Sequence, residues 1–488
     1  MQFSKFEGHR RVSAPPANAH LVTNIGTCGV PLQCFPEFAS ERAQTSVTGI
    51  VTLHVVIHNN VRNALRDTLS AVWTRVDFSP SDDAAFFARL PAASAVFVLR
   101  PNAGGEPYIS KSANLRRRLQ RLLGVAEGRR LSLRDRVASV EYTEVGGDFE
   151  AGFVLYQLLR NELPDKYTAR LHLRPAPLLH LLAENRYPRL AVTTRIRSLR
   201  AGVYFGPFAT RAEAEQYAHD SLDFFLLRRC TEELAPDPAF PGCVYSEMKM
   251  CLAPCFKGCT DERYAEESSR VERYLESGGH SLVVEIGRLR DEASERLEFE
   301  AAAAAHARLE KVKSVQSRIA EIVHRLDQLN GVLLQPSHLP GHIALFRIAG
   351  GMLHGPVPFD VNPRPAQPTP GAKAPTAQVQ SMEARIKTAL AEVEVQRPTS
   401  AQQWMEHLAL LKRWYYRGSK VGEIFFEDAT ANRRDGYAAE GAPVAGAGLP
   451  MRRVVRAVGR VYKGEKPTAD LSETAGDYWA FRAREAGL

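Results

Sequence analysis

The sequence contains 488 residues, too many for one hydrophobic core, so we expect about three domains. Hydrophobic residues make up 44% of the chain and charged residues 24%, which is typical of a soluble globular protein and excludes a disordered or fibrous class. The apolar stretch Gly49–Ile57 is interrupted by Thr52 and His54, so it indicates neither a membrane span nor a leader. We therefore expect a cytoplasmic protein with no membrane partner.

Net charge and cysteine usage narrow the function classes further. A net charge of +8 favours contact with a polyanion, because lysine and arginine release condensed counterions when they neutralise phosphates. Charge alone leaves the alternative of a merely solvated arginine-rich face. Seven cysteines without a secretory signal argue against a disulfide framework and favour metal ligation or reduced thiols.

The first part of the chain predicts a disordered segment followed by a small α/β domain. Residues 1–85 scatter Pro, Asn, Ser and Gly without a period, so we expect a poorly ordered segment with one strand at Val51–Ile57. Residues 86–185 alternate short apolar strands with amphipathic helices. The expected elements are strands at Ala95–Arg100, Pro107–Ile109 and Val137–Val145, and helices from about Ser112 and over Phe149–Asn161.

Three further regions follow. Residues 186–262 predict a cysteine-rich module, residues 263–335 show a helical period, and residues 336–488 change to a mixed α+β pattern. Their expected elements are a strand at Arg189–Thr194, helices over Arg211–Leu227, Asp261–Leu329, Val379–Glu394 and Ala401–Tyr416, a hairpin around Gly350-Gly351, a Pro-rich linker at 363–375 and a basic tail over Arg452–Lys466.

A first group of residues suits phosphodiester cleavage: Ala95-Val96-Phe97, Tyr108-Ile109-Ser110-Lys111 and, on the next helix, Arg118. Cleavage needs a positioned water, a base and cations that absorb charge developing on the phosphate. The group resembles the GIY-YIG nuclease signature, which implies that Tyr108, Lys111 and Arg118 face one concave surface. Phe97 stands where the signature has a tyrosine. The alternative is a core tyrosine beside solvated arginines.

The resemblance also implies a metal-binding glutamate on a later helix, which in the UvrC family lies in a segment similar to Glu-Ala-Leu-Leu-Leu-Glu. This chain reads Glu150-Ala151-Gly152-Phe153-Val154-Leu155. Leu155 therefore occupies the ligand position, and an alkyl side chain cannot bind Mg²⁺ or Mn²⁺, which take oxygen ligands. Glu150 lies round the helix, and Glu162 lies about 10 Å further along its axis. We expect a degenerate nuclease centre.

A second group, Cys230-x12-Cys243-x7-Cys251-x3-Cys255, is spaced by turn residues that bring four thiols together. Four thiolates enclose either a tetrahedral Zn²⁺ or an iron-sulfur cluster. The surrounding segments, among them Leu227-Arg228-Arg229-Cys230 and Cys251-Leu252-Ala253-Pro254-Cys255, resemble the cysteine-rich region of UvrC. That resemblance implies a four-iron (4Fe-4S) cluster as the first choice, with structural zinc as the alternative. Cys259 is expected to be a spare thiol, and Cys28 and Cys34 lie apart.

A third group, residues 293–303, resembles the UVR motif, the antiparallel helix pair by which UvrC docks on UvrB. The resemblance implies that Leu297 and Phe299 face a partner. The alternative is an Ala-rich amphipathic hairpin in which these two side chains face a core. The expected fold is thus an α/β domain followed by a cysteine-rich module, an α-helical UVR-type hairpin and a mixed α+β region.

The order of the three groups is that of UvrC and indicates a DNA-binding protein of nucleotide excision repair. We find no RNase-H-like domain or helix-hairpin-helix motif between Gln335 and Leu488, so we expect no second nuclease. The expected contacts with double-stranded DNA are Arg116, Arg117 and Arg121, with the basic tail as an alternative surface. Two other functions remain open: an active Cho-like endonuclease with a displaced metal ligand, and a metal- or redox-sensing DNA-binding regulator.

Overall fold

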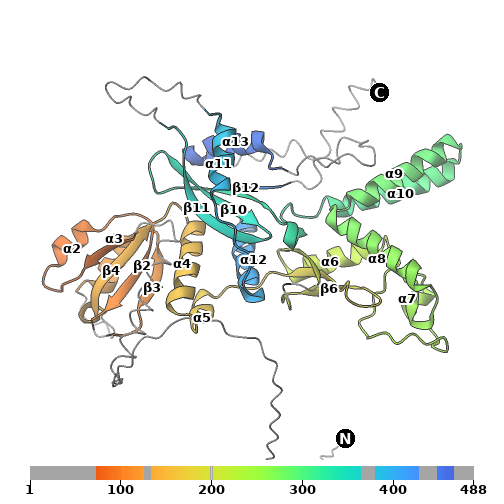
Figure 1. Ribbon diagram of the computed structural model, residues 1–488, viewed down its shortest axis with the longest axis horizontal. Helices are drawn as coiled ribbons and strands as arrows, with labels where there is room; N and C mark the ends of the chain where they lie inside the picture. Colours follow the sequence, from red (N-terminus) through yellow and green to blue (C-terminus); the bar gives the residue numbers. More distant parts are fainter. Residues whose placement is uncertain are drawn as a thin grey trace, which may run out of the picture. The chain divides into compact units, whose positions relative to one another are not determined.

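The computed structural model describes residues 73–465, apart from residues 103, 126–132, 198, 200–201, 364–379 and 428–447. The strand expected at Val51–Ile57, the thiols of Cys28 and Cys34, and nearly all of the Pro-rich linker lie outside the described residues. Within these residues the chain forms a mixed α/β fold with three four-stranded antiparallel sheets, each accompanied by helices (Figure 1).

The first sheet has the strand order β1-β4-β2-β3. Its elements are β1 (Thr74–Asp77), α2 (Asp83–Arg89), β2 (Ala95–Pro101), β3 (Tyr108–Ser112), α3 (Leu115–Leu123), a 3₁₀ turn at Arg134–Arg136, β4 (Val137–Glu144), α4 (Asp148–Glu162) and α5 (Tyr167–Leu171). The expected strands and helices of this region are confirmed. Ordered structure begins before the expected boundary at residue 86, because β1 pairs with β4 along its whole length.

Alternation along the strands gives this sheet two different apolar faces. Phe97 and Leu99 of β2 pack with α2 and α3 on one face. Val96 and Val98 pack with Ile109 and with α4 on the other face. Strand β3 is an edge strand, so its polar side chains lie at the margin of the sheet, alternately on one face and on the other.

The second sheet has the order β6-β5-β7-β8 and is followed by long helices. The elements are β5 (Leu178–Leu181), β6 (Leu190–Thr193), β7 (Val203–Gly206), α6 (Arg211–Leu222), α7 (Val244–Glu247), a 3₁₀ turn at Pro254–Phe256, α8 (Asp261–Glu276), α9 (His280–Glu295), α10 (Phe299–Gln316), β8 (His324–Arg325) and a 3₁₀ turn at Leu326–Gln328. The helical region therefore ends earlier than expected. The cause is tertiary: β8 pairs with β7, and Arg325 binds Glu272 of α8 at 3.1 Å.

The third sheet has the order β11-β10-β9-β12 and helices on both faces. Its elements are β9 (Gly331–Pro336), β10 (His342–Ala349), β11 (Met352–Asp360), α11 (Met382–Ala391), α12 (Ala401–Tyr415), β12 (Glu423–Phe426) and α13 (Met451–Lys463). The expected β-hairpin is confirmed, with Gly350 and Gly351 at φ 54° and 74° in its turn. Helix α12 covers one face, whereas α11 and α13 pack side by side on the other (Figure 1).

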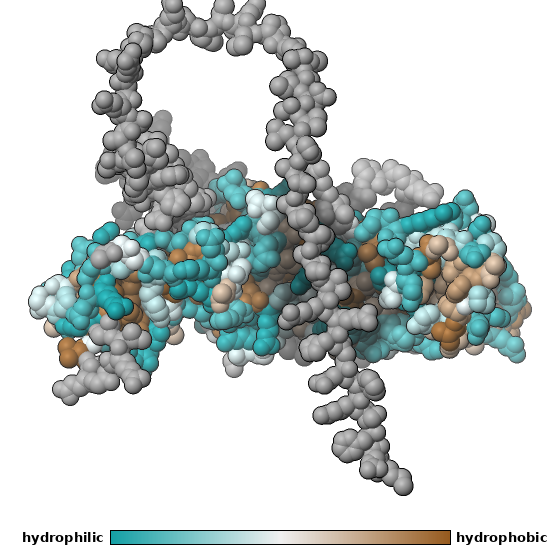
Figure 2. Space-filling view, turned by 90° about the horizontal axis from the view of Figure 1, so that it is seen from below, coloured by the Kyte–Doolittle hydropathy of each residue, from teal (hydrophilic) through white to brown (hydrophobic). Residues whose placement is uncertain are grey.

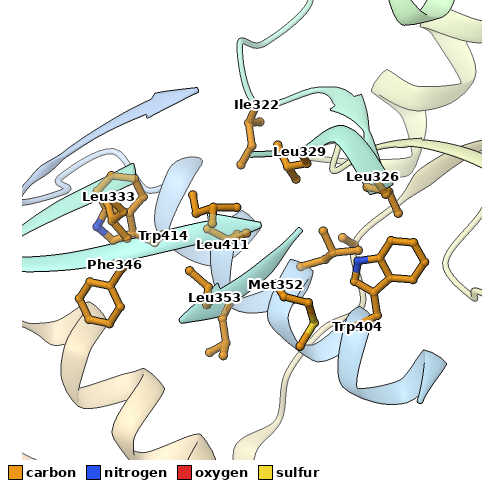
Figure 3. Packing of buried hydrophobic residues seen from close by; sticks show 14 of the residues in the cluster. Ile322, Leu326, Leu329, Leu333, Phe346, Met352, Leu353, Trp404, Leu411 and Trp414 are labelled. Atoms are coloured by element: carbon orange, nitrogen blue, oxygen red, sulfur yellow. The ribbon is translucent and has the colours of Figure 1, made fainter. Parts of the chain in front are cut away.

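The core between α12 and the third sheet also receives α4. Trp404 and Trp414 belong to one apolar cluster with Leu411, Phe346 and Leu333, in which Trp414 lies near Leu333 and Trp404 lies at the other end (Figure 3). Their indole nitrogens donate hydrogen bonds to the Gly350 carbonyl at 2.8 Å and to the Val421 carbonyl at 3.2 Å. Phe149 and Phe153 of α4 pack edge-on against Phe346. Helix α4 is therefore shared by two cores.

In the part of the chain that the structure describes, no helix is both long and apolar enough to cross a membrane. Hydrophilic residues cover most of the face seen in Figure 2.

Candidate functional site

Tyr108 and Arg118 lie together beside the edge strand β3. The Asn114 side chain caps α3 by accepting a hydrogen bond from the Arg117 backbone nitrogen at 2.9 Å, which fixes where the helix begins. One turn later, Arg118 Nη2 donates to the Tyr108 hydroxyl at 3.2 Å. The ring of Phe97 is fully buried and lies 6.2 Å from the Tyr108 ring between centroids. Phe97 thus keeps the shape of a tyrosine without its hydroxyl.

Lys111 emerges on the opposite face of the sheet. It pairs with Val96 across the strands, whereas Tyr108 pairs with Leu99, so the pleat directs the two side chains apart. The Lys111 ammonium lies 3.9 Å from the position that a β-carbon on Gly152 would occupy. Tyr108, Lys111 and Arg118 therefore do not share the one concave surface that the sequence predicts: Lys111 belongs to the α4 side.

Leu155 lies on α4, which covers the face of the sheet that carries Lys111, so it does not lie beside Tyr108 and Arg118 as the sequence predicts. It follows Gly152 by three residues, so both positions lie on the same side of the helix. Its side chain is half-buried and packs against the apolar cluster that contains Val96, Val98 and Ile109. The position where the family resemblance implies a carboxylate is therefore occupied by an alkyl group in an apolar setting.

The two nearby glutamates are committed to other contacts. Glu150 is buried and accepts a hydrogen bond from the Gly146 backbone nitrogen at 2.8 Å. Burial raises the pKa of Glu150 to about 7, because the carboxylate has lost its solvent. Glu162 receives two hydrogen bonds from Arg100, at 2.8 and 2.9 Å, and Arg100 also binds Glu141. Neither glutamate presents a free carboxylate to position 155.

Asp148 is the carboxylate that contacts Lys111, and the sequence analysis overlooked it. The Lys111 ammonium lies 2.5 Å from Asp148 Oδ1, and Arg417 Nη1 lies 2.6 Å from Oδ2. Partial burial favours the neutral acid, but hydrogen bonds from Lys111 and then Arg417 hold the pKa of Asp148 below its usual value. Asp148, Gly152 and Leu155 follow the i, i+4, i+7 spacing of one helix face, which is the signal that could have revealed it.

The arginines of α3 have different surroundings. Arg116 donates to the Leu90 carbonyl at 2.7 Å and to the Ala88 carbonyl, so it closes the end of α2. Arg117 and Arg121 are exposed. Arg116 therefore has a structural role, and the DNA contacts expected of Arg116, Arg117 and Arg121 stay a prediction.

The five described cysteines are free thiols, and Cys230, Cys243 and Cys255 lie near enough to Cys251 to influence its ionisation. Burial raises the pKa of Cys251 to about 11, and Cys230, Cys255 and Cys243 raise it further through their charges. The Ala253 backbone nitrogen donates to Cys251 Sγ at 3.2 Å. Over the described residues, no group of three or more His, Cys, Asp or Glu side chains is arranged as a metal site. The donor set itself is one that zinc and iron-sulfur clusters use.

The tip of the α9–α10 hairpin carries two exposed apolar side chains. Leu297 is 70% exposed and Phe299 is 69% exposed, and Leu297 has φ 62°, which folds the chain back between the helices. Leu309 and Val312 of α10 are buried in the core around α8 and α6. The alternative in which Leu297 and Phe299 face a core does not hold, because both side chains project from the tip.

Comparison with known proteins shows which part of this chain is similar to a known family. Residues 176–274 match the family model described as UvrC/Cho excinuclease, middle domain. This chain is a relative of the UvrC/Cho excinucleases. The UvrC/Cho match begins just before β5 and ends in α8, so it contains three of the four strands of the second sheet, β5, β6 and β7, and all four cysteines. It extends beyond the 186–262 range expected from the sequence.

Individual UvrC relatives match about half of this chain. The UvrABC system protein C of Rickettsia bellii is 27% identical over 255 residues, which cover 52% of this chain and 39% of that protein. The same protein of Alkalilimnicola ehrlichii is 28% identical over 49% of this chain and 39% of its own length. That of Rhizobium meliloti is 30% identical, over 48% and 35% respectively. The match thus spans less than two fifths of these relatives. No solved structure shows significant similarity.

Proposed function

We propose that this chain is a UvrC-like, DNA-binding protein of nucleotide excision repair whose GIY-YIG-like centre does not cut. The observation that carries the proposal is Leu155, an alkyl side chain that packs in an apolar cluster on α4 at the position where the resemblance implies a metal-binding carboxylate. A divalent metal that assists phosphodiester hydrolysis needs oxygen ligands. The residues present do not fit such an ion: Glu150 and Glu162 are held elsewhere. The proposal assigns no second nuclease centre to the described C-terminal residues.

Without a metal, the remaining polar groups suit binding rather than hydrolysis. Arg118 and the Tyr108 hydroxyl form one donor pair at the sheet edge, and Arg117 and Arg121 add charge on the same helix. Cations of this kind fix the position of a phosphate backbone without selecting a base sequence. We infer that the α/β domain holds double-stranded DNA without regard to its base sequence.

A cleavage assay tests this proposal directly. Wild-type protein should leave nicked or damaged duplex intact in Mg²⁺ or Mn²⁺ while still binding it. Leu155→Glu places a carboxylate on the face of the sheet that carries Lys111 and should produce metal-dependent nicking on the order of tenfold above background. This gain is far below the several kcal/mol that a bound metal can supply, because Tyr108 and Arg118 lie on the other face of the sheet. Leu155→Gln has nearly the same shape without the charge and should stay inactive. Cleavage by the wild-type protein would contradict the proposal.

Asp148 supports a second candidate, a Cho-like endonuclease with a displaced metal ligand. It is a carboxylate on the same helix face as Leu155 and touches Lys111. Lys111 and Arg417 already neutralise the Asp148 carboxylate. A metal ion would have to compete with these two cations. If the wild-type protein does cut, Asp148→Asn and Arg118→Ala should both abolish cutting under this candidate. If it does not cut, Arg118→Ala should only weaken DNA binding.

DNA affinity should be mainly electrostatic. Replacing Arg117 and Arg121 together by alanine should flatten the plot of log affinity against log salt by about two units, because each lost phosphate contact removes about one. All duplex sequences should weaken alike. The matched control is Arg211→Ala with Arg288→Ala, which removes the same charge from exposed helix positions elsewhere. An unchanged slope in the α3 variant would show that DNA binds another surface.

Two further parts of the proposal concern a cofactor and a partner. Cys230, Cys243, Cys251 and Cys255 would hold a four-iron cluster, or zinc in its place, and such a group would cross-link the loop that contains them. The exposed tip residues Leu297 and Phe299 would dock on a UvrB-type partner, since apolar side chains at a helix-hairpin tip suit insertion into a groove. A metal- or redox-sensing regulator remains the alternative and would require sequence-specific DNA sites.

A further inference from the structure

Helix α13 is a basic element that the proposed function leaves unused. Its thirteen residues contain four arginines and one lysine and no acidic residue. One side of the helix is apolar and packs on the third sheet. The buried residues of this side are Val454, Ala457, Val458 and Val461, each at most 4% exposed. This packing fixes the rotation of the helix, so the opposite side must face outward.

The outward side carries a row of positive charge, which we call the basic face: Arg452, Arg456, Gly459 and Lys463. These positions are spaced by four, three and four residues, so they lie in one narrow row along the helix. The three charged side chains are exposed. Lys463 lies 3.8 Å from the exposed Glu465. Within the residues that the structure describes, Arg452 and Arg456 have no acidic partner.

The two other arginines of α13 have structural contacts that set the margin of this face. Arg460 donates two hydrogen bonds to Glu423 of β12, at 2.8 and 2.7 Å. Arg453 lies over the Phe425 ring, 5.6 Å from its centroid. Both tie the helix to β12. Arg453 and Arg460 thus anchor α13 to the sheet, whereas the cations of the basic face project away from it.

We propose that the basic face of α13 binds the phosphate backbone of DNA as a second contact surface, distinct from α3. The inference rests on the proposed DNA binding of this chain. Arg452 and Lys463 are eleven residues apart, about 16 Å along the axis at 1.5 Å per residue. That length corresponds to about five nucleotides of one B-DNA strand at 3.4 Å each. The row can therefore contact several phosphates.

The structure favours DNA over other partners of basic amphipathic helices. A membrane surface or a peptide-binding groove takes up the apolar side of such a helix. In α13 that side is already buried against β9 and its neighbours, so only the charged side is offered. A row of cations that offers no apolar contact suits a partner whose negative charges are regularly spaced. A nucleic-acid backbone is such a polyanion.

Gly459 allows a test that adds charge without disturbing the core. A β-carbon at this position would meet no atom within 4 Å. Gly459→Lys extends the row by one cation, and Gly459→Glu places a negative charge inside it. The matched control is Gly287 of α9, where a β-carbon would also meet no atom within 4 Å. Both glycines are helical, so each substitution improves helix propensity.

The measurement is binding of the full chain to a labelled duplex over a series of salt concentrations. Gly459→Lys should tighten binding and steepen the log-log salt slope by about one unit, whereas Gly459→Glu should weaken binding several-fold. Arg452→Ala with Arg456→Ala should flatten the slope by about two units. The same changes at Gly287 should leave affinity and slope at the wild-type values. An undiminished urea midpoint will show that each variant is folded.

Unchanged affinity and slope in all α13 variants, together with a loss in the Arg117 and Arg121 variant, would overturn this inference and leave the proposed function intact. Absence of DNA binding by the wild-type protein would overturn both. Vesicles with anionic lipids serve as a competitor of different geometry. If they bind the wild-type protein and respond to Gly459→Glu while duplex binding does not, the surface belongs to a membrane and the inference is wrong.

Discussion

Replacing Cys251 by serine should remove the metal or cluster from protein purified under anaerobic conditions and should markedly destabilise the middle domain. Cys251 is the thiol whose pKa burial and its three cysteine neighbours raise most clearly, to about 11. A cysteine loses its thiol proton when it binds a metal ion. In the empty site the resulting thiolates would repel one another, and the bound cation removes this repulsion. Structural metal sites contribute on the order of 10 kcal/mol to folding.

The measurements are iron, sulfide and zinc content together with the thermal unfolding midpoint. Wild-type protein should be brown and contain iron and sulfide. Cys259→Ser is the matched control: Cys259 packs at the margin of the apolar core and should keep the metal. Stoichiometric zinc without iron would establish the zinc alternative. Protein without either metal, and as stable as its Cys251→Ser variant, would rule out both.

Replacing Glu406 by alanine should cost about 3 kcal/mol of unfolding free energy. Glu406 is buried in α12 and accepts hydrogen bonds from the hydroxyls of Tyr156 at 2.9 Å and Tyr167 at 2.8 Å. Burial and the adjacent Glu406 raise the pKa of Tyr167 to about 12. Truncation leaves the buried hydroxyl of Tyr156 and the half-buried hydroxyl of Tyr167 without this acceptor, and each fully buried group of this kind costs about 1–3 kcal/mol.

Urea denaturation of matched variants separates this loss from simple cavity formation. Glu406→Gln keeps an acceptor oxygen and should cost clearly less than Glu406→Ala. In the alanine background, Tyr156→Phe should recover part of the stability, because it removes one unsatisfied hydroxyl. A Glu406→Ala variant within about 0.5 kcal/mol of the wild type would show that the hydrogen bonds from Tyr156 and Tyr167 to Glu406 contribute nothing to the stability of the fold.

The order of elements and the chemical identity of the sites follow from the sequence alone. Strands β2, β3 and β4 and helix α4 lie where apolar periodicity and turn residues predict them, because these signals act over a few residues. The spacing of the four cysteines and the presence of Leu155 at the implied ligand position are also properties of the sequence. The resemblance to the UvrC/Cho excinucleases is confirmed, whereas the nuclease-like centre, the metal or cluster and the UVR-type docking site stay predictions.

Which side chains meet was decided by the tertiary structure. Arg417 binds Asp148 across 269 positions, and Arg100 binds Glu162 across 62, and no local pattern specifies such pairs. The pleat of β3 separates Lys111 from Tyr108, which could be known only once the register with β2 was fixed. Likewise, the charge of α13 is visible in the sequence, but only burial of its apolar side against the third sheet leaves the basic face as the surface that it presents.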